Sequence, residues 1–318
     1  MADVVCLGIL VADIWARPVD EFERGRLAVV QETGIGLGGC AANTGVGLAR
    51  LGVATAVQGC VGVDGLGDLV LDALRRDGID VSGIYRTVEA NTSSTLVLID
   101  SAGERTFLHC FGADGHIEVA RLDLEAIQSA RLLHLGGVLL MPGFDGEPQA
   151  QVLALAQAAG VTTCVDTAWD DRGLWMSVVG PLLPHTDLIL PSLSEAQHLT
   201  GREAPEAAAQ ALLDAGVKIV ALKMGPEGCY LRTAQDELRL PAYPVEVVDG
   251  NGSGDAFVAG FLYGQLHGWD LERSGKFGSA LGALCATAAG TTAGLRDYDQ
   301  VLAFLEAREP GQWAGLAH

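Results

Sequence analysis

A glycine-rich loop between two aspartates is the stretch of this sequence best suited to chemistry. It reads VDGNGSGDAF, and its aspartates are Asp249 and Asp255. An apolar run follows Asp255, so the loop should open a helix. Amides at a helix N-terminus attract anions, and glycines let the backbone approach phosphate oxygens closely. The loop is therefore predicted to bind phosphate through the amides of Gly252, Ser253, Gly254 and Asp255.

A carboxylate inside a phosphate-binding loop calls for a chemical role, because it would repel the phosphate. Asp255 could accept the proton of a substrate hydroxyl that attacks a γ-phosphoryl group, while the loop amides stabilise the transferred charge. At a helix N-terminus its carboxylate is expected to stay ionised. The structural alternative is a plain strand–turn–helix junction. A Walker loop is excluded because no Lys-Ser/Thr follows the glycines. A Rossmann fingerprint is excluded because the GxGxxG spacing is missing.

Alternating apolar strands and amphipathic helices are expected to position this loop. Strands are predicted at 3–12, 55–62, 131–140, 161–166, 186–192 and 217–225. Helices are predicted at 38–52, 67–78, 145–159, 204–215, 254–267, 271–290 and 299–308. This pattern indicates a mostly parallel sheet covered on both faces. Two segments, 13–36 and 88–112, break the pattern and are expected to form a small sheet inserted in a single domain, 1–318.

Composition limits the classes of partner. The chain has 318 residues, 49% of them hydrophobic, which suffices for one large α/β domain. Its formal net charge of −20 argues against nucleic acid and anionic membranes as partners. Seven scattered cysteines without a CxxC pair indicate neither a disulfide framework nor a zinc site. The apolar N-terminus carries Asp3 and Asp13 and is typical of a buried strand. A cytoplasmic location is predicted.

The loop resembles the C-terminal signature of the ribokinase/PfkB carbohydrate kinase family, D-T-x-G-A-G-D-x-F. Asp249, Gly252, Gly254 and Asp255 match it, whereas Gly250 stands where threonine is usual. The resemblance implies that Asp255 is the catalytic base. It also implies a monovalent-cation site, for K⁺, beside this segment. Gly250 argues against K⁺ activation, and Asp249 is expected either to order the loop or to contact the cation.

Sugar recognition is implied by an N-terminal segment, GLGGCAANTGVGLARLG, which resembles the family's other signature. Gly38, Gly39 and Asn43 match it, and bare backbone beside an amide suits polyol recognition. Asp13 is expected to follow the first strand, at the sheet edge where open α/β sheets bind ligands. By resemblance, it would hydrogen-bond sugar hydroxyls. Arg105, on a predicted hairpin, could also face the substrate. The alternative for the glycine segment is capping of a helix, with Asn43 incidental. Asp13 could instead be a turn or cap carboxylate, and Arg105 a solubilising surface residue.

ATP and Mg²⁺ are implied by two further motifs. LPSLSEAQHLTG resembles the family's P-N-x-x-E-A-x-x-L-T-G; Glu195 matches and would support Mg²⁺ through water, whereas Ser192 replaces the usual Asn. VALKMGPEGCYL resembles V-T-x-G-x-x-G, with Gly225 and Gly228 at the nucleotide and Lys223 near its phosphates. Alternatively, Glu195 lies in the first turn of a helix, and Lys223 is solvated.

Three aspartates follow the strand predicted at 161–166. They are Asp166, Asp170 and Asp171. A role in the site is open to Asp166, but no pattern separates it from the other two, and all three could cap the next turn.

In this order, the motifs imply a ribokinase-like three-layer α/β/α sandwich with a mostly parallel central sheet and a small β-sheet lid. The implied reaction transfers the γ-phosphoryl group of MgATP to a hydroxyl of a small sugar or sugar-like substrate. A nucleoside kinase on the same scaffold is one alternative. A non-catalytic sugar- or nucleotide-sensing protein is the alternative from another class. An open lid face would suit a homodimer through the lid.

Overall fold

A nine-stranded sheet forms the centre of the molecule, with the strand order β13-β12-β11-β10-β9-β8-β1-β4-β5. The computed structural model describes residues 2–21, 23–102 and 104–313. The strands of the sheet are β1 (Val4–Gly8), β4 (Thr55–Gly62), β5 (Ile84–Thr87), β8 (Leu132–Val138), β9 (Thr162–Thr167), β10 (Leu188–Ile189), β11 (Ile219–Lys223), β12 (Cys229–Arg232) and β13 (Glu237–Leu240). Neighbours from β5 to β11 pair in parallel, whereas β12 and β13 extend the edge in antiparallel fashion. The predicted mostly parallel sheet is confirmed.

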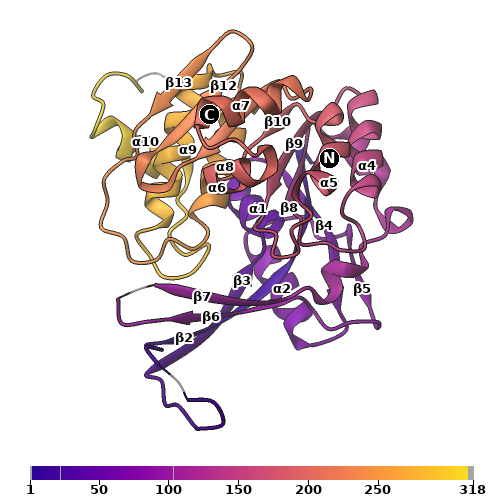
Figure 1. Cartoon of the computed structure of the whole chain (residues 1–318), viewed down its shortest axis with the longest axis vertical. Coiled ribbons are helices and arrows are strands. Elements are labelled where there is room, and N and C mark those ends of the chain that lie inside the picture. The colour runs from indigo at the N-terminus through magenta and orange to yellow at the C-terminus, as the bar shows by residue number, and fades with distance from the viewer. Residues whose placement is uncertain (1, 22, 103, 314–318) are drawn as a thin grey trace.

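Helices cover both faces of this sheet, so the body has three layers (Figure 1). One face packs against α1 (Cys40–Arg50), α2 (Gly65–Arg76), α8 (Ser253–Leu266), α9 (Leu271–Cys285) and α10 (Tyr298–Glu306). The other packs against α3 (Leu124–Ser129), α4 (Glu147–Ala158), α5 (Trp175–Val179), α6 (Leu193–Thr200) and α7 (Pro205–Asp214). Short 3₁₀ helices lie at 112–116, 119–121, 180–185 and 225–227. Alternate side chains of β1 enter the two cores, as expected for a strand buried on both faces.

A second, four-stranded sheet projects from the body and is called the lid below (Figure 1). Its order is β3-β2-β6-β7, and its strands are β2 (Val11–Arg17), β3 (Glu32–Gly38), β6 (Ser94–Ile99) and β7 (Arg105–Cys110). β2 pairs antiparallel with β3 and parallel with β6, and β6 pairs antiparallel with β7. Two segments far apart in the sequence therefore build one sheet, as predicted from the interrupted pattern.

The strand predicted at 3–12 is in fact two strands, and this changes the place of Asp13. β1 ends at Gly8 and β2 begins at Val11, so Asp13 lies inside a lid strand and not after the first strand of the body. Gly8 permits the transition, because a Cβ there would lie 1.9 Å from the carbonyl oxygen of Gly136. The continuous apolar run concealed this change of sheet.

Other predicted elements differ mainly in length. The strand predicted at 186–192 is a two-residue pairing, β10, and the helix predicted at 271–290 ends at Cys285. The edge strand β13 was not predicted. All seven cysteines are free; five are buried, Cys40 is half-buried and Cys110 is exposed. Within the described ranges, no helix combines the length and apolar character needed to cross a membrane.

Candidate active site

Asp255 lies in the first turn of α8, where the glycine-rich loop meets the body. Gly252 precedes this helix with a φ of 77°, and a Cβ there would lie 2.2 Å from the carbonyl oxygen of Thr291. Glycine is therefore required at this position. The amides of Gly254 and Asp255 have no partner within the helix, as for any first turn. Ser253 differs, because both its amide and its hydroxyl donate to the carbonyl oxygen of Gly250, at 3.3 and 2.7 Å.

Asn43, on α1, holds the Asp255 carboxylate. Its Nδ2 donates to Asp255 Oδ2 at 2.8 Å, and the neighbouring Thr44 hydroxyl donates to the Asp255 carbonyl at 3.4 Å. Asn43 is 3% exposed, and its Oδ1 is buried without a partner in the described part of the chain. A buried acceptor of this kind is costly unless a ligand satisfies it. Asn43 can thus bind the carboxylate and a substrate hydroxyl together.

Opposing effects act on the pKa of Asp255. Burial raises the pKa of Asp255, the Asn43 amide and the Lys223 ammonium oppose the rise, and Glu195 adds to it. The expectation of ionisation rested on the helix N-terminus alone. The structure adds burial as an opposing cause, which makes Asp255 a stronger base than an exposed aspartate.

Lys223 and Asp166 form a buried ion pair beside the loop. Lys223 ends β11, Asp166 lies near the end of β9, and Lys223 Nζ lies 2.7 Å from Asp166 Oδ1. A Cβ on Gly254 would lie 3.7 Å from Lys223 Nζ, so the ammonium adjoins the loop. Burial raises the pKa of Asp166 to about 7 against the opposing effect of Lys223, and Glu195 and Asp255 raise it further. Burial opposes the charge on Lys223, but Asp166 and Glu195 outweigh it and raise its pKa.

Glu195 both caps a helix and faces this cluster. Ser192 is the N-cap of α6, and Glu195 Oε2 accepts from the Ser192 amide at 2.9 Å and from the Thr167 hydroxyl at 3.0 Å. Glu195 thus lies in the first turn of a helix, as the alternative expectation had it, and Ser192 is the cap. Gly225 and Gly228 follow in the turn after β11, with positive φ angles of 56° and 93°. A Cβ on Gly228 would lie 1.9 Å from the Leu240 carbonyl oxygen, so this glycine lets β12 and β13 pack.

A cavity of about 140 Å³ opens between Asp255 and the lid. Asp13 faces it from β2, and burial together with the charge of Asp255 raises the pKa of Asp13 to about 7. Side-chain hydrogen bonds from Asn251 and Thr95 oppose that rise. A Cβ on Gly38 would lie 2.5 Å from the Asp13 carboxylate. The structure thus brings the predicted residues Asp13, Asn43 and Asp255 to one cavity. Gly38 leaves room for the Asp13 carboxylate.

One more glycine and two side chains of the lid also line this cavity. Gly39 lines the same cavity, and its missing Cβ would lie 2.4 Å from the carbonyl oxygen of Ile9. Phe107 and His109 reach the cavity from β7. Asn251 and Thr95 were not predicted. A carboxylate whose partners come from distant segments gives no local signal of them.

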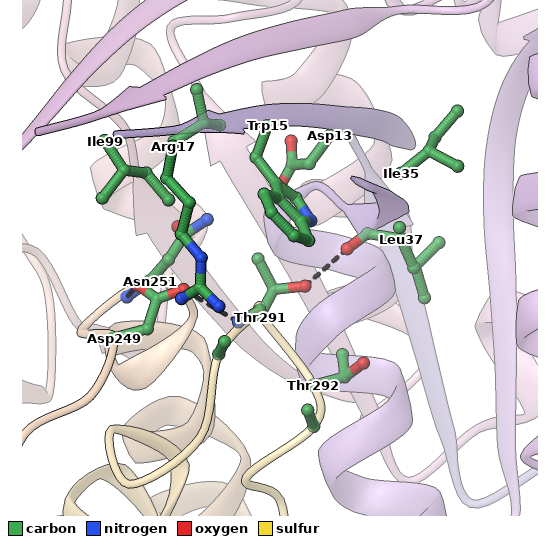
Figure 2. Close-up of a pocket in the computed structure, with 15 residues that line it drawn as sticks. Asp13, Trp15, Arg17, Ile35, Leu37, Ile99, Asp249, Asn251, Thr291 and Thr292 are labelled. Carbon is green, nitrogen blue, oxygen red and sulfur yellow. Dashed lines mark hydrogen bonds between the residues drawn. The ribbon is translucent and has the colours of Figure 1, made fainter. Parts of the chain in front are cut away.

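A second cavity, of about 210 Å³, shares Asn251 and Thr291 with the first (Figure 2). Trp15 and Arg17 from β2 line it together with Asp13 (Figure 2). It is larger than the first cavity, but Asp255 is not among the residues that line it.

Arg105 lines neither of these two cavities. It was predicted to face substrate, but its guanidinium pairs with Asp249, with Nη1 and Oδ1 2.5 Å apart. The structure also separates the aspartates that the sequence left equivalent. Asp166 pairs with Lys223, whereas Asp170 accepts from the amides of Arg172 and Trp175 and caps a turn. Asp171 is exposed.

Comparison with known proteins agrees with this geometry. The model of the pfkB family carbohydrate kinases matches residues 1–297. A 2-dehydro-3-deoxygluconokinase of Bacillus subtilis is 30% identical over 318 residues, covering 96% of each chain. The solved Arabidopsis thaliana ribokinase, complexed with ribose and ATP, has a TM-score of 0.85 at 25% identity over 96% of this chain and 99% of that one. A putative ribokinase II from E. coli, in complex with ATP and Mg²⁺, has the same TM-score at 24% identity, over 96% and 100% of the two chains.

Proposed function

The chain belongs to the pfkB family of carbohydrate kinases, and from this premise we propose that it transfers the γ-phosphoryl group of ATP to a hydroxyl of a small sugar or sugar acid. The observation that carries the proposal is the placement of Asp255. Its carboxylate lies in the first turn of α8, is held by Asn43, and lines the cavity that Asp13 enters from the lid. A base, an anion-binding helix start and a polyol-binding wall thus share one space.

Asp255 is the proposed general base. The proton of the acceptor hydroxyl passes to a carboxylate oxygen of Asp255, and the hydroxyl oxygen forms a bond to the γ-phosphorus. The bond from the γ-phosphorus to the bridging oxygen of the β-phosphate breaks, and ADP leaves. The first-turn amides of α8 stabilise the charge on the transferred group. The Ser253 amide contributes least, because it already donates to Gly250.

The residues at the sheet edge suit the phosphates of ATP and a Mg²⁺ ion. The carboxylates of Asp166, Glu195 and Asp255 lie near one ammonium group, that of Lys223. The excess of negative charge there favours a divalent cation. Within the described residues, no group of three or more His, Cys, Asp or Glu side chains could hold a metal. Mg²⁺ commonly keeps several of its waters and binds through one or two carboxylates and substrate phosphates. Glu195 would hold the ion through water, and bound Mg²⁺ would neutralise charge on the phosphates. Lys223, which adjoins the first turn of α8, would supply a positive charge to the same phosphates.

Asp13, Gly39 and Asn43 are the proposed contacts of the acceptor. A carboxylate and an unpaired amide oxygen both accept hydrogen bonds, so they favour a polyol with adjacent hydroxyls. The relative named 2-dehydro-3-deoxygluconokinase adds sugar acids to the candidates. A nucleoside is the second candidate, because Phe107 lines the cavity and is 52% exposed, which would allow it to stack on a base.

The test is release of ADP from MgATP in the presence of aldoses, ketoses, 2-dehydro-3-deoxy sugar acids and nucleosides. We expect turnover with a sugar or sugar acid. We expect Asp255→Asn to lose on the order of 100- to 10,000-fold in kcat, because it removes the base. Its thermal unfolding should match that of the wild type. Near-normal turnover by a folded Asp255→Asn variant would remove the mechanism, and turnover of nucleosides alone would favour the second candidate.

We also propose a homodimer through the outer face of the lid. One row of apolar side chains crosses all four strands, because Ile35 pairs with Ile14, Ile14 with Leu96, and Leu96 with Leu108. Three of them are 44–53% exposed, which is a continuous apolar surface that a second copy would cover. Light scattering should give twice the monomer mass, and Leu108→Glu should give the monomer. A monomeric wild type would contradict the proposal. A cytoplasmic location stays a prediction from composition.

A further inference from the structure

Asp249 connects three segments of the chain. Its Oδ1 accepts from the Arg105 guanidinium at 2.5 Å and from the Asn251 amide at 2.9 Å, and its Oδ2 accepts from the Gly290 amide at 2.8 Å. Arg105 begins the lid strand β7, Asn251 belongs to the phosphate-binding loop, and Gly290 lies between α9 and α10. The side chain of Asp249 is 12% exposed and that of Arg105 is 23% exposed. A carboxylate so far removed from water requires a positive partner, and Arg105 supplies it.

Gly250 makes room for this arginine. A Cβ on Gly250 would lie 2.9 Å from Arg105 Nη2. The backbone of Gly250 does not have a positive φ, so conformational freedom does not explain the glycine. A side chain at this position would require the end of the Arg105 side chain to shift. Gly250 and Arg105 therefore form a matched pair, one providing space and the other filling it.

A monovalent cation fits this site poorly. Both oxygens of Asp249 already accept hydrogen bonds, and the fixed charge of Arg105 lies against one of them. A cation bound to the same carboxylate would meet a like charge at short range. The family resemblance implies K⁺ beside this segment, whereas the departure at Gly250 argued against K⁺ activation. The contacts of Asp249 give that second expectation a physical basis.

We propose that Arg105 is a positioning residue that holds Asp249 and the phosphate-binding loop from the lid, and that phosphoryl transfer by this chain therefore does not depend on K⁺. The inference rests on the proposed kinase function of the same loop. Arg105 acts through Asp249, which sets the position of residues 250–252 and hence of the first-turn amides and Asp255. The lid meets the same loop at a second place, since Asp13 and Asn251 line the same two cavities. Lid position and loop order are thereby coupled.

The first test replaces K⁺ by choline at constant ionic strength and measures kcat for the wild type with its best acceptor. We expect less than about a twofold change. Loss of activity on the order of 100-fold without K⁺, the scale expected when reacting groups are misplaced, would overturn the proposal.

The second test uses Arg105→Ala and Arg105→Lys. We expect Arg105→Ala to lose on the order of 100-fold in kcat and to regain part of it with added guanidinium, an effect that a purely structural defect would not show. Arg105→Lys should keep more activity than Arg105→Ala. Arg26→Ala is the matched control, because Arg26 is also a lid arginine paired with a carboxylate, Glu23, but is 75% exposed. It should match the wild type.

A gain of function sharpens the result. In the double variant Arg105→Ala/Gly250→Thr, the guanidinium is removed and the side chain usual in relatives is restored, so we expect K⁺ to stimulate activity. Wild-type kcat in folded Arg105→Ala, or the absence of guanidinium rescue, would contradict the proposal. If Arg105→Ala does not fold, the wild-type cation test and Arg105→Lys still decide. Either failure leaves the kinase function standing as long as Asp255→Asn is inactive.

Discussion

The phosphate side and the acceptor side of the candidate active site are formed by different structural elements. The phosphate side lies at the edge of the central sheet, where Asp166 is 1% exposed and Lys223 16% exposed in an ion pair of 2.7 Å. The acceptor side combines Asn43 of α1 with residues of the lid strands. Four of the six residues of β7 are exposed, including Phe107, although Phe107 also reaches the cavity.

This difference is consistent with separate roles for the sheet edge and the lid. Groups that act on the phosphates must be held in one geometry, and a sheet edge buried on both faces restricts them. The lid residues proposed to select the acceptor lie on a sheet that is joined to the proposed phosphate-binding loop by polar contacts. One such contact is the ion pair of Arg105 with Asp249. Variation in the lid can therefore change the acceptor without disturbing the chemistry.

The largest effect on stability is expected on the phosphate side. Lys223→Met leaves Asp166 buried without its partner, and breaking a buried pair costs about 3–5 kcal/mol. We expect the free energy of unfolding, measured in urea, to fall by this order and turnover to fall with it. The double variant Lys223→Met/Asp166→Asn should recover part of the stability but not the turnover.

The control for this prediction lies on the lid. Arg17 and Glu32 also form an ion pair, but their side chains are 42% and 55% exposed. Exposed pairs contribute about 0–1 kcal/mol, so Glu32→Gln should unfold almost as the wild type does. Equal losses for Lys223→Met and Glu32→Gln would contradict the contrast between the two regions.

A smaller, pH-dependent effect is expected at Asp13. Burial, aided by the charge of Asp255, raises the pKa of Asp13 from 3.8 to about 7 in the folded protein. A carboxyl with a raised folded pKa stabilises the fold fully below its unfolded pKa and loses that contribution as the pH rises through 7. Asp13→Asn has no such charge. Its stability relative to the wild type should therefore increase between pH 4.5 and pH 8.

Urea unfolding at the two pH values measures this gain, and kinetics measure its cost. KM for the acceptor should rise about tenfold or more in Asp13→Asn, since a charged hydrogen bond contributes about 1.5–3 kcal/mol. A stability difference that does not change with pH would contradict the raised pKa of Asp13. An unchanged KM would remove Asp13 from the acceptor site.

The sequence predicted those parts of the site that depend on neighbours in the chain. The glycines before Asp255, the capping pair Ser192 and Glu195, and the segment with Asn43 are local patterns. Helix starts and tight turns are determined within a few residues, so their positions and their types could be read directly. The order of these patterns along the chain was sufficient to imply the three-layer fold.

Contacts between distant segments were not readable in this way. The sequence marked Gly250 as a departure from the family signature, but the reason is an arginine 145 residues earlier in the chain. It likewise left Asp166 equivalent to Asp170 and Asp171 until β9 and β11 placed Asp166 beside Lys223. The apolar run through 3–12 hid the point at which the chain leaves the body for the lid.

Local spacing determined which chemistry this chain carries, because loops, caps and helix starts depend on adjacent residues. The tertiary structure alone decided which charges neutralise one another, because pairing depends on the packing of strands and loops that the sequence keeps far apart. Asp249 illustrates both: its place before the loop follows from the sequence, and its partner, Arg105, follows from the fold of the lid over the body.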